Sequence, residues 1–122
     1  LTAKALYGNF IVLEIAPRIF VHYAHLRQGS VAVKAGDHVR RGAVLGRLGV
    51  SGSAGTPHLH LHVSDTATFA ESQGLPFVFD TFLLAGHGNE GDALDNTSRM
   101  QLKAEPERRR NQLPLDGDLI GF

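Results

Sequence analysis

The chain has 122 residues, the size of one small domain, and 43% of its residues are hydrophobic, as in an ordinary globular protein. Twelve basic and twelve acidic side chains cancel, so no overall electrostatic field points to a nucleic-acid partner or an anionic membrane. The chain has no cysteine, which excludes disulfides and thiolate metal sites and leaves histidine, aspartate and glutamate as transition-metal ligands.

The sequence contains no segment that would insert into a membrane. No stretch approaches the roughly 20 consecutive apolar residues that a spanning helix needs, and the N-terminus lacks the basic region and apolar run of a signal peptide. The chain begins at Leu1 and leads almost at once into a strand-like run. We therefore expect it to be a fragment of a longer protein.

The first half of the chain is typical of short strands joined by turns. Fourteen glycines punctuate runs of β-branched, aliphatic and aromatic residues, which predicts an all-β fold, an antiparallel sheet or half-barrel of short strands. Residues 9–15 and 19–26 are predicted to form a hairpin around a turn at Pro17. Because strand side chains alternate, His25 is predicted on the opposite face of the second strand from His22.

Shorter signals follow the hairpin. Apolar pieces between turn-forming residues predict further short strands within residues 30–49, and a Gly- and Ser-rich loop within residues 49–57. The next strand is predicted at His58 to Ser64, and another apolar run extends from Pro76 to Leu84.

The composition becomes polar and charged after residue 86. We predict a main domain over residues 1–86 and a loosely held polar tail over residues 87–122. Leu119, Ile120 and Phe122 could dock as a terminal strand. The run of three arginines at 108–110 is interpreted as a solvated surface without interleaved aromatic residues, which again does not favour nucleic acid.

The most informative segment is Pro57-His58-Leu59-His60-Leu61-His62-Val63. Alternation on a strand places its three histidines on one face, roughly 6.5 Å apart, and sends Leu59, Leu61 and Val63 into the core. A histidine ladder of this kind can provide one metal ligand and a second imidazole that acts on water, which is the chemistry of a zinc hydrolase. Chance alternation of surface histidines with core leucines is the alternative, and three of seven histidines within five residues argue against it.

The other candidate residues carry weaker signals. His25 at the end of its strand is equally compatible with an ordinary polar surface position, as are His22, His38 and His87. The loop Gly49-Val50-Ser51-Gly52-Ser53 fails the G-x-S-x-G pattern of a serine nucleophile, because Ser53 stands at the last glycine position and no helix follows.

Several motifs together resemble the lysostaphin/LytM-type zinc metallopeptidases in order and spacing, over about Tyr7 to Asp65. They are Gly8-Asn9-Phe10-Ile11-Val12, Tyr23-Ala24-His25-Leu26, Val33-Lys34-Ala35-Gly36-Asp37-His38-Val39, Gly42-Ala43-Val44-Leu45-Gly46 and Pro57-His58-Leu59-His60. The resemblance implies a zinc endopeptidase that cleaves peptide bonds in bacterial cell-wall peptidoglycan, with an antiparallel sheet beneath the metal groove. It also implies an extracytoplasmic location, in the periplasm, the cell envelope or the medium.

The resemblance also implies a role for each site residue. His60 corresponds to a zinc ligand, His58 to the general base or acid, and His25 to a residue that stabilises the transition state from the groove wall. His62 stands where the family often has an acidic residue, so we consider it a support behind His60. His62 and Asp65 are also the local candidates for a substitute ligand, because the upstream segment that carries the family's other His and Asp ligands does not precede Tyr7 here.

The sequence is also compatible with two further interpretations. One is a catalytically inactive LytM-like domain that binds peptidoglycan or a partner protein, against which the presence of His25, His58 and His60 argues. The other follows from the Val-Lys-Ala-Gly-Asp-x-Val-x-x-Gly pattern at 33–42, which also resembles half of a biotinyl/lipoyl carrier or sugar-phosphotransferase barrel. A carrier presents its lysine on a hairpin tip, usually beside a methionine, and the single methionine, Met100, lies far away in the tail.

Overall fold

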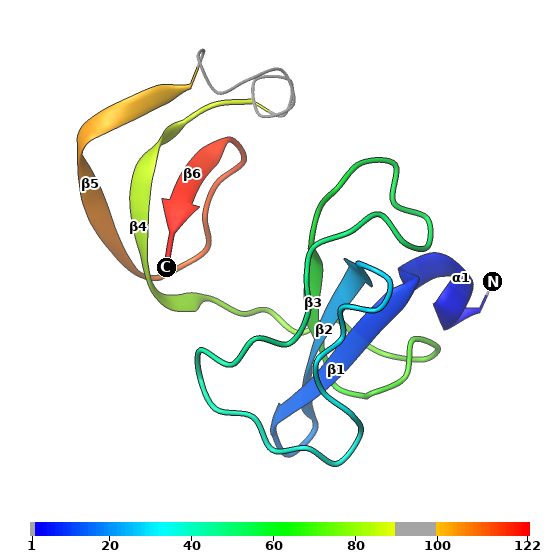
Figure 1. Cartoon of the computed structure of the whole chain (residues 1–122). Helices are drawn as coiled ribbons and strands as arrows, with labels where there is room; N and C mark the ends of the chain where they lie inside the picture. Colours follow the sequence, from blue (N-terminus) through cyan, green and yellow to red (C-terminus); the bar gives the residue numbers. More distant parts are fainter. Residues whose placement is uncertain (1, 90–99) are drawn as a thin grey trace. The chain divides into compact units, whose positions relative to one another are not determined.

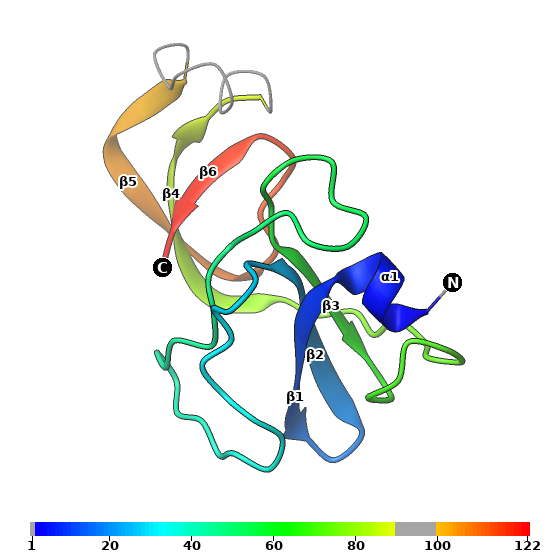
Figure 2. The same cartoon turned by 45° about the vertical axis from the view of Figure 1, so that its right-hand side comes forward.

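A computed structural model describes residues 2–89 and 100–122. The chain divides into two compact units, Leu1–Pro76 and Phe77–Phe122, each built around one three-stranded antiparallel sheet (Figure 1; Figure 2). The described residues contain one short helix, α1 (Ala3–Tyr7), so the predicted all-β class is confirmed. Both sheets are open, and none of the described strands close into a barrel. Across the described ranges, no helix is long and apolar enough to cross a membrane.

The first sheet has the strand order β1-β2-β3 and starts with the predicted hairpin. β1 (Asn9–Ala16) and β2 (Ile19–Leu26) pair antiparallel across a two-residue turn. Both strands are rich in β-branched and aromatic side chains, which fit a pleated, half-buried surface. β3 (His60–Ser64) pairs antiparallel with the other edge of β2 and begins two residues later than predicted, since His58 makes only an isolated bridge to Gly49.

A β-bulge at His25 changes which face of the sheet this side chain of β2 points to. Asn9 of β1 pairs with Leu26 of β2, and Ile11 pairs with Tyr23. Between these two pairs β1 advances by two residues, whereas β2 covers three. His25 has a φ of 62°, a left-handed conformation that costs a non-glycine residue on the order of 1–2 kcal/mol. The extra residue interrupts the alternation and brings the His25 ring to 5.7 Å from that of His60, on the face of His22. The prediction that His25 and His22 face opposite ways is therefore wrong.

The core of the first unit is small. Its buried hydrophobic residues are Tyr7, Val21, Ala24, Leu26 and Val63. Val63 is buried as predicted, whereas Leu59 is 42% exposed, so the prediction that it enters the core is wrong. The reason is that Leu59 precedes the first residue of β3 and is not held by the strand ladder.

The short strands predicted within residues 30–49 do not form, apart from isolated contacts. Leu48 bridges Leu26, and the Ala32 N–H donates to the Leu45 carbonyl at 2.8 Å. Single bonds of this kind do not make a ladder, because a strand needs a continuous row of partners. The predicted loop between residue 49 and Pro57 is confirmed.

The second unit contains a sheet with the order β5-β4-β6. Its central strand, β4 (Phe79–His87), pairs antiparallel with β5 (Gln101–Gln112) on one side and with β6 (Asp118–Gly121) on the other. Among the described residues of this unit, the buried hydrophobic side chains are Phe82 and Leu84, which both lie on the central strand. β6 coincides with the terminal strand predicted near Leu119 and Ile120.

The structure departs from the loosely held tail predicted over residues 87–122. The second unit begins at Phe77, and most of the described residues of the tail lie in strands; residues 90–99 lie outside the described part of the chain. β5 escaped prediction because nearly every residue of it is exposed, so it has no apolar alternation. Its backbone bonds to β4 hold it in place, and these do not depend on side-chain type.

Candidate active site

Five histidines of the first unit come together, and we call them the histidine cluster. They are His22, His25, His58, His60 and His62. Antiparallel pairing of β2 with β3 places His22 directly opposite His62 and Ala24 opposite His60. The β-bulge in β2 places His25, and the segment just before β3 places His58. The centroids of these two rings are 4.7 Å apart. The structure thus brings all four predicted site histidines together.

The hydrogen bonds of His25 and His58 determine which ring nitrogen of each carries the proton. His25 Nδ1 lies 2.8 Å from the Ser51 carbonyl oxygen, and His58 Nδ1 lies 2.9 Å from the Thr56 carbonyl oxygen. A carbonyl oxygen only accepts, so both Nδ1 atoms donate. In the neutral rings Nε2 then has no hydrogen and can accept a proton. This is the tautomer that a general base needs.

His60 and His62 are half-buried and are linked to each other. His60 Nε2 is 3.0 Å from His62 Nδ1, and His62 Nε2 is 3.4 Å from the Tyr7 hydroxyl. Burial lowers the pKa of His60 below its usual 6.5, and the neighbouring His25, His58 and His22 lower it further. Burial, His22 and His60 likewise lower the pKa of His62. Both rings are therefore neutral at neutral pH, as metal ligation by imidazole requires.

His22 was given no role from the sequence, yet it is the most deeply buried histidine of the cluster, with 1% exposure. Its Nε2 lies 2.7 Å from Ser64 Oγ and 3.2 Å from the Thr66 carbonyl oxygen, to which the Ser64 hydroxyl itself donates. Nε2 must therefore be the donor, which leaves the buried Nδ1 without a hydrogen-bond partner in the part of the chain that the structure describes. Antiparallel pairing of the two predicted strands was the signal that could have placed His22 beside His62.

Ser51 and two glycines hold the loop that positions His25. The Ser51 hydroxyl accepts from the Asn9 N–H at 2.9 Å and donates to the Leu26 carbonyl at 2.7 Å. Gly8 and Gly52 both have positive φ, and a Cβ on either would overlap the backbone of the other's segment. The Gly-Ser loop therefore has a structural function at the cluster, in agreement with the rejection of a serine nucleophile.

The other predicted candidates lie elsewhere. The Asp65 carboxylate accepts the Gln73 N–H at 2.8 Å and so closes the loop after β3. Its proposed role as a substitute ligand stays a prediction. His38 lines a separate pocket, and His87 belongs to the second unit, where its Nδ1 lies 3.0 Å from Asp118.

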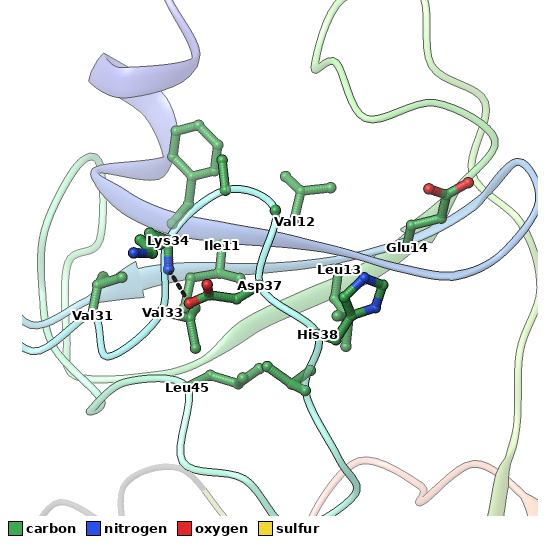
Figure 3. A pocket seen from close by; sticks show the side chains of 14 residues that line it. Ile11, Val12, Leu13, Glu14, Val31, Val33, Lys34, Asp37, His38 and Leu45 are labelled. Carbon is green, nitrogen blue, oxygen red and sulfur yellow. Dashed lines mark hydrogen bonds between the residues drawn. The ribbon is translucent and has the colours of Figure 1, made fainter.

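The pocket beside His38 has a volume of about 590 Å³ and runs along β1 rather than over the histidine cluster. Figure 3 shows its largely apolar lining, with Ile11 and Leu13 from β1 and Val33 and Leu45 from the following loops. The one hydrogen bond drawn there joins the Lys34 N–H to Asp37 Oδ2, at 3.0 Å. No catalytic group predicted from the sequence lines this pocket, so we do not assign the chemistry to it.

The histidine cluster fits zinc as part of a ligand set. Imidazole is a donor that zinc accepts, and no hydrogen bond of His60 Nδ1 is found in the described ranges. However, among residues 2–89 and 100–122 no group of three or more His, Cys, Asp or Glu side chains could hold a metal ion. A catalytic zinc site usually has three protein ligands. These residues can therefore contribute to such a site but do not complete it.

Comparison with known proteins identifies the first unit. The family model of Peptidase family M23 matches residues 2–71, which contain the entire histidine cluster and Tyr7. The searches of curated proteins and of solved structures gave no match. The second unit lies outside the matched residues.

Proposed function

This chain belongs to Peptidase family M23, and from that premise we propose that it forms part of a zinc metalloendopeptidase that cleaves peptide bonds in bacterial peptidoglycan. The observation that carries the proposal is the histidine cluster, in which two rings have an Nε2 and a third has an Nδ1 without a hydrogen-bond partner among residues 2–89 and 100–122. A protein with this substrate works outside the cytoplasm, in the periplasm, the cell envelope or the medium.

Each histidine has a separate task in the proposed reaction. His58 is exposed and anchored through Nδ1, so its Nε2 can take a proton from the attacking water and return it to the leaving amine. His25 is buried, and once protonated its Nε2 can donate to the oxygen on which negative charge develops. His60 provides the metal-binding nitrogen.

Zinc, when bound, supplies a Lewis acid that polarises the peptide carbonyl and makes water a stronger acid. His60 would hold it from this part of the chain. We propose that the remaining ligands come from outside the residues that the structure describes, because those residues contain no three-member ligand group. The lowered pKa of His60 favours the neutral ring that a metal ligand must have.

A second function, a domain of the same family that binds peptidoglycan or a partner protein without cleavage, is favoured by the same incomplete ligand group. The two functions differ in one measurable way. A binding domain retains its affinity for peptidoglycan peptides when His58 is replaced and produces no cleavage products. The peptidase loses turnover when His58 is replaced, while substrate binding is largely preserved.

The decisive experiment compares the chain with its His60→Ala variant, and uses His38→Ala as the matched control. Each protein is purified without metal and titrated with zinc, and cleavage of peptidoglycan-derived peptides is followed by mass spectrometry. We expect His60→Ala to lower whatever zinc affinity and cleavage the chain has, and His38→Ala to leave both unchanged. Equal zinc binding by all three proteins would contradict the assignment of His60, and peptide binding without cleavage would favour the binding domain.

A further inference from the structure

Tyr7, His62 and His60 form a continuous row of hydrogen-bonded side chains. The Tyr7 hydroxyl lies 3.4 Å from His62 Nε2, and His62 Nδ1 lies 3.0 Å from His60 Nε2. Tyr7 is 4% exposed, and its ring packs edge-on against Phe10 and Phe69, with centroid distances of 5.6 and 5.0 Å. The row therefore begins at a well-packed aromatic ring and ends at His60.

His22 fixes the plane of the middle ring. The rings of His22 and His62 stack with centroids 4.3 Å apart and planes 8° apart. His22 is itself held by its hydrogen bonds to Ser64 and Thr66. His62 therefore presents Nδ1 to His60 and Nε2 to Tyr7, and a rotation of its ring would break the stack and both hydrogen bonds.

Two arrangements of hydrogens satisfy this row. In the first, His60 Nε2–H donates to His62 Nδ1, and His62 Nε2–H donates to the Tyr7 oxygen. In the second, the Tyr7 hydroxyl donates to His62 Nε2, and His62 Nδ1–H donates to His60 Nε2. The second arrangement places the proton of a neutral His60 on Nδ1. Only the first leaves Nδ1 of His60 without a hydrogen, as a metal-binding nitrogen must be.

We infer that Tyr7 and His62 are positioning residues that hold His60 in one orientation and one tautomer, with Nε2–H donated to His62 and Nδ1 free. The inference rests on the proposed function, because the need for a free metal-binding Nδ1 on His60 selects the first arrangement over the second. The tautomer itself is a property of the metal-free chain. No proton is transferred along the row.

The chemistry of this support is unusual. The partner behind a metal-binding histidine is commonly a carboxylate, a backbone carbonyl or water. Here the partner is an imidazole, whose Nδ1 lies 3.0 Å from His60 Nε2. A neutral imidazole has a hydrogen of its own on the far nitrogen, so it needs an acceptor there. The Tyr7 oxygen is placed to be that acceptor.

The test is nitrogen NMR of the histidine rings in the metal-free, ¹⁵N-labelled chain. We expect a scalar coupling across the hydrogen bond between His60 Nε2 and His62 Nδ1, with the proton on the His60 side and His60 Nδ1 unprotonated. His62→Leu should abolish the coupling and expose the His60 Nε2–H to solvent exchange. In His62→Gln, the amide oxygen can accept the same proton, so slow exchange should be restored. His38→Gln serves as the control and should leave His60 unchanged.

Tyr7→Phe tests the far end of the row, because it removes the acceptor for His62 Nε2–H while keeping the ring. We expect the His60 signals to report a mixture of tautomers in this variant, with an unchanged backbone amide spectrum. A single unchanged His60 tautomer in Tyr7→Phe would show that Tyr7 has no positioning role. A proton on His60 Nδ1 in the unsubstituted chain would overturn the inference as a whole.

Zinc titration separates this inference from the proposed function. Loss of the supporting partner should weaken zinc binding roughly 10- to 100-fold in His62→Leu, with recovery in His62→Gln. If the expected coupling is present but His60→Ala does not alter zinc binding, the proposed function fails and the positioning role stands. If zinc binding depends on His60 but the coupling is absent, the positioning role fails and the proposed function stands.

Discussion

Replacement of Ser51 with alanine should destabilise the first unit by removing both hydrogen bonds of its hydroxyl. Ser51 Oγ accepts the Asn9 N–H at 2.9 Å and donates to the Leu26 carbonyl at 2.7 Å, and both bonds are partly buried. They join the start of β1 and the end of β2 to the loop that carries the His25 anchor. Alanine keeps the backbone carbonyl that His25 uses, so the change removes the bonds without altering the anchor itself.

The magnitude follows from the two bonds. Each contributes about 0.5–1.5 kcal/mol net, so the free energy of unfolding should fall by about 2 kcal/mol in total. That loss lowers the ratio of folded to unfolded molecules roughly 30-fold. Ser53→Ala is the matched control, because the Ser53 hydroxyl makes one exposed bond, to the Leu6 carbonyl at 3.0 Å. Its cost should stay below about 1 kcal/mol.

Urea titration followed by tyrosine fluorescence measures this unit selectively. The chain has no tryptophan, and its two tyrosines, Tyr7 and Tyr23, both lie in the first unit. Equal losses in Ser51→Ala and Ser53→Ala would refute the structural role of Ser51.

Three further outcomes are expected. Gly52→Ala should cost more than about 1 kcal/mol in the same titration, because Gly52 has a φ of 72° and an added Cβ would overlap the backbone at the end of α1. The lowered pKa values of His60 and His62 mean that the unfolded chain binds more protons than the folded one below pH 6.5, so stability should fall as pH decreases from 6.5 towards the folded pKa values. A urea midpoint for the first unit that does not change over that pH range would contradict those shifts. Phe82→Ala, at a side chain 2% exposed, should cost about 3–5 kcal/mol and accelerate amide exchange in β4, whereas Phe122→Ala, at 83% exposure, should have little effect.

The sequence identified the parts of the first unit that depend on local pattern. The hairpin of β1 and β2 follows from β-branched runs on either side of a turn, and both strand bounds agree with prediction to within one residue. The histidine ladder of β3 follows from alternation, and the ordered set of motifs that ends at His58 and His60 was sufficient to identify the family. These features are predictable because each is encoded within a few neighbouring residues.

The second unit shows what such patterns miss. β5 is a strand with polar side chains on both faces, so its hydrophobic pattern resembles that of a solvated tail. Its position depends on backbone bonds to β4, whose partners lie up to 33 residues away, as in the pairing of Phe79 with Gln112. Pairing between distant segments depends on topology, which a single sequence specifies weakly.

The histidine cluster itself depends on a departure from regular alternation. Regular alternation along the strands places three of its rings on one face once β2 is paired with β3. These are the rings of His22, His60 and His62. His25 has the opposite parity, and only the bulge, with its left-handed φ, brings it to the same side. Histidine adopts this conformation more readily than most non-glycine residues. The Ser51 carbonyl then fixes the ring by its bond to Nδ1. In a regular strand, the His25 ring would point away from the cluster. The left-handed conformation that brings it to the cluster costs on the order of 1–2 kcal/mol, and the fold retains it at this residue.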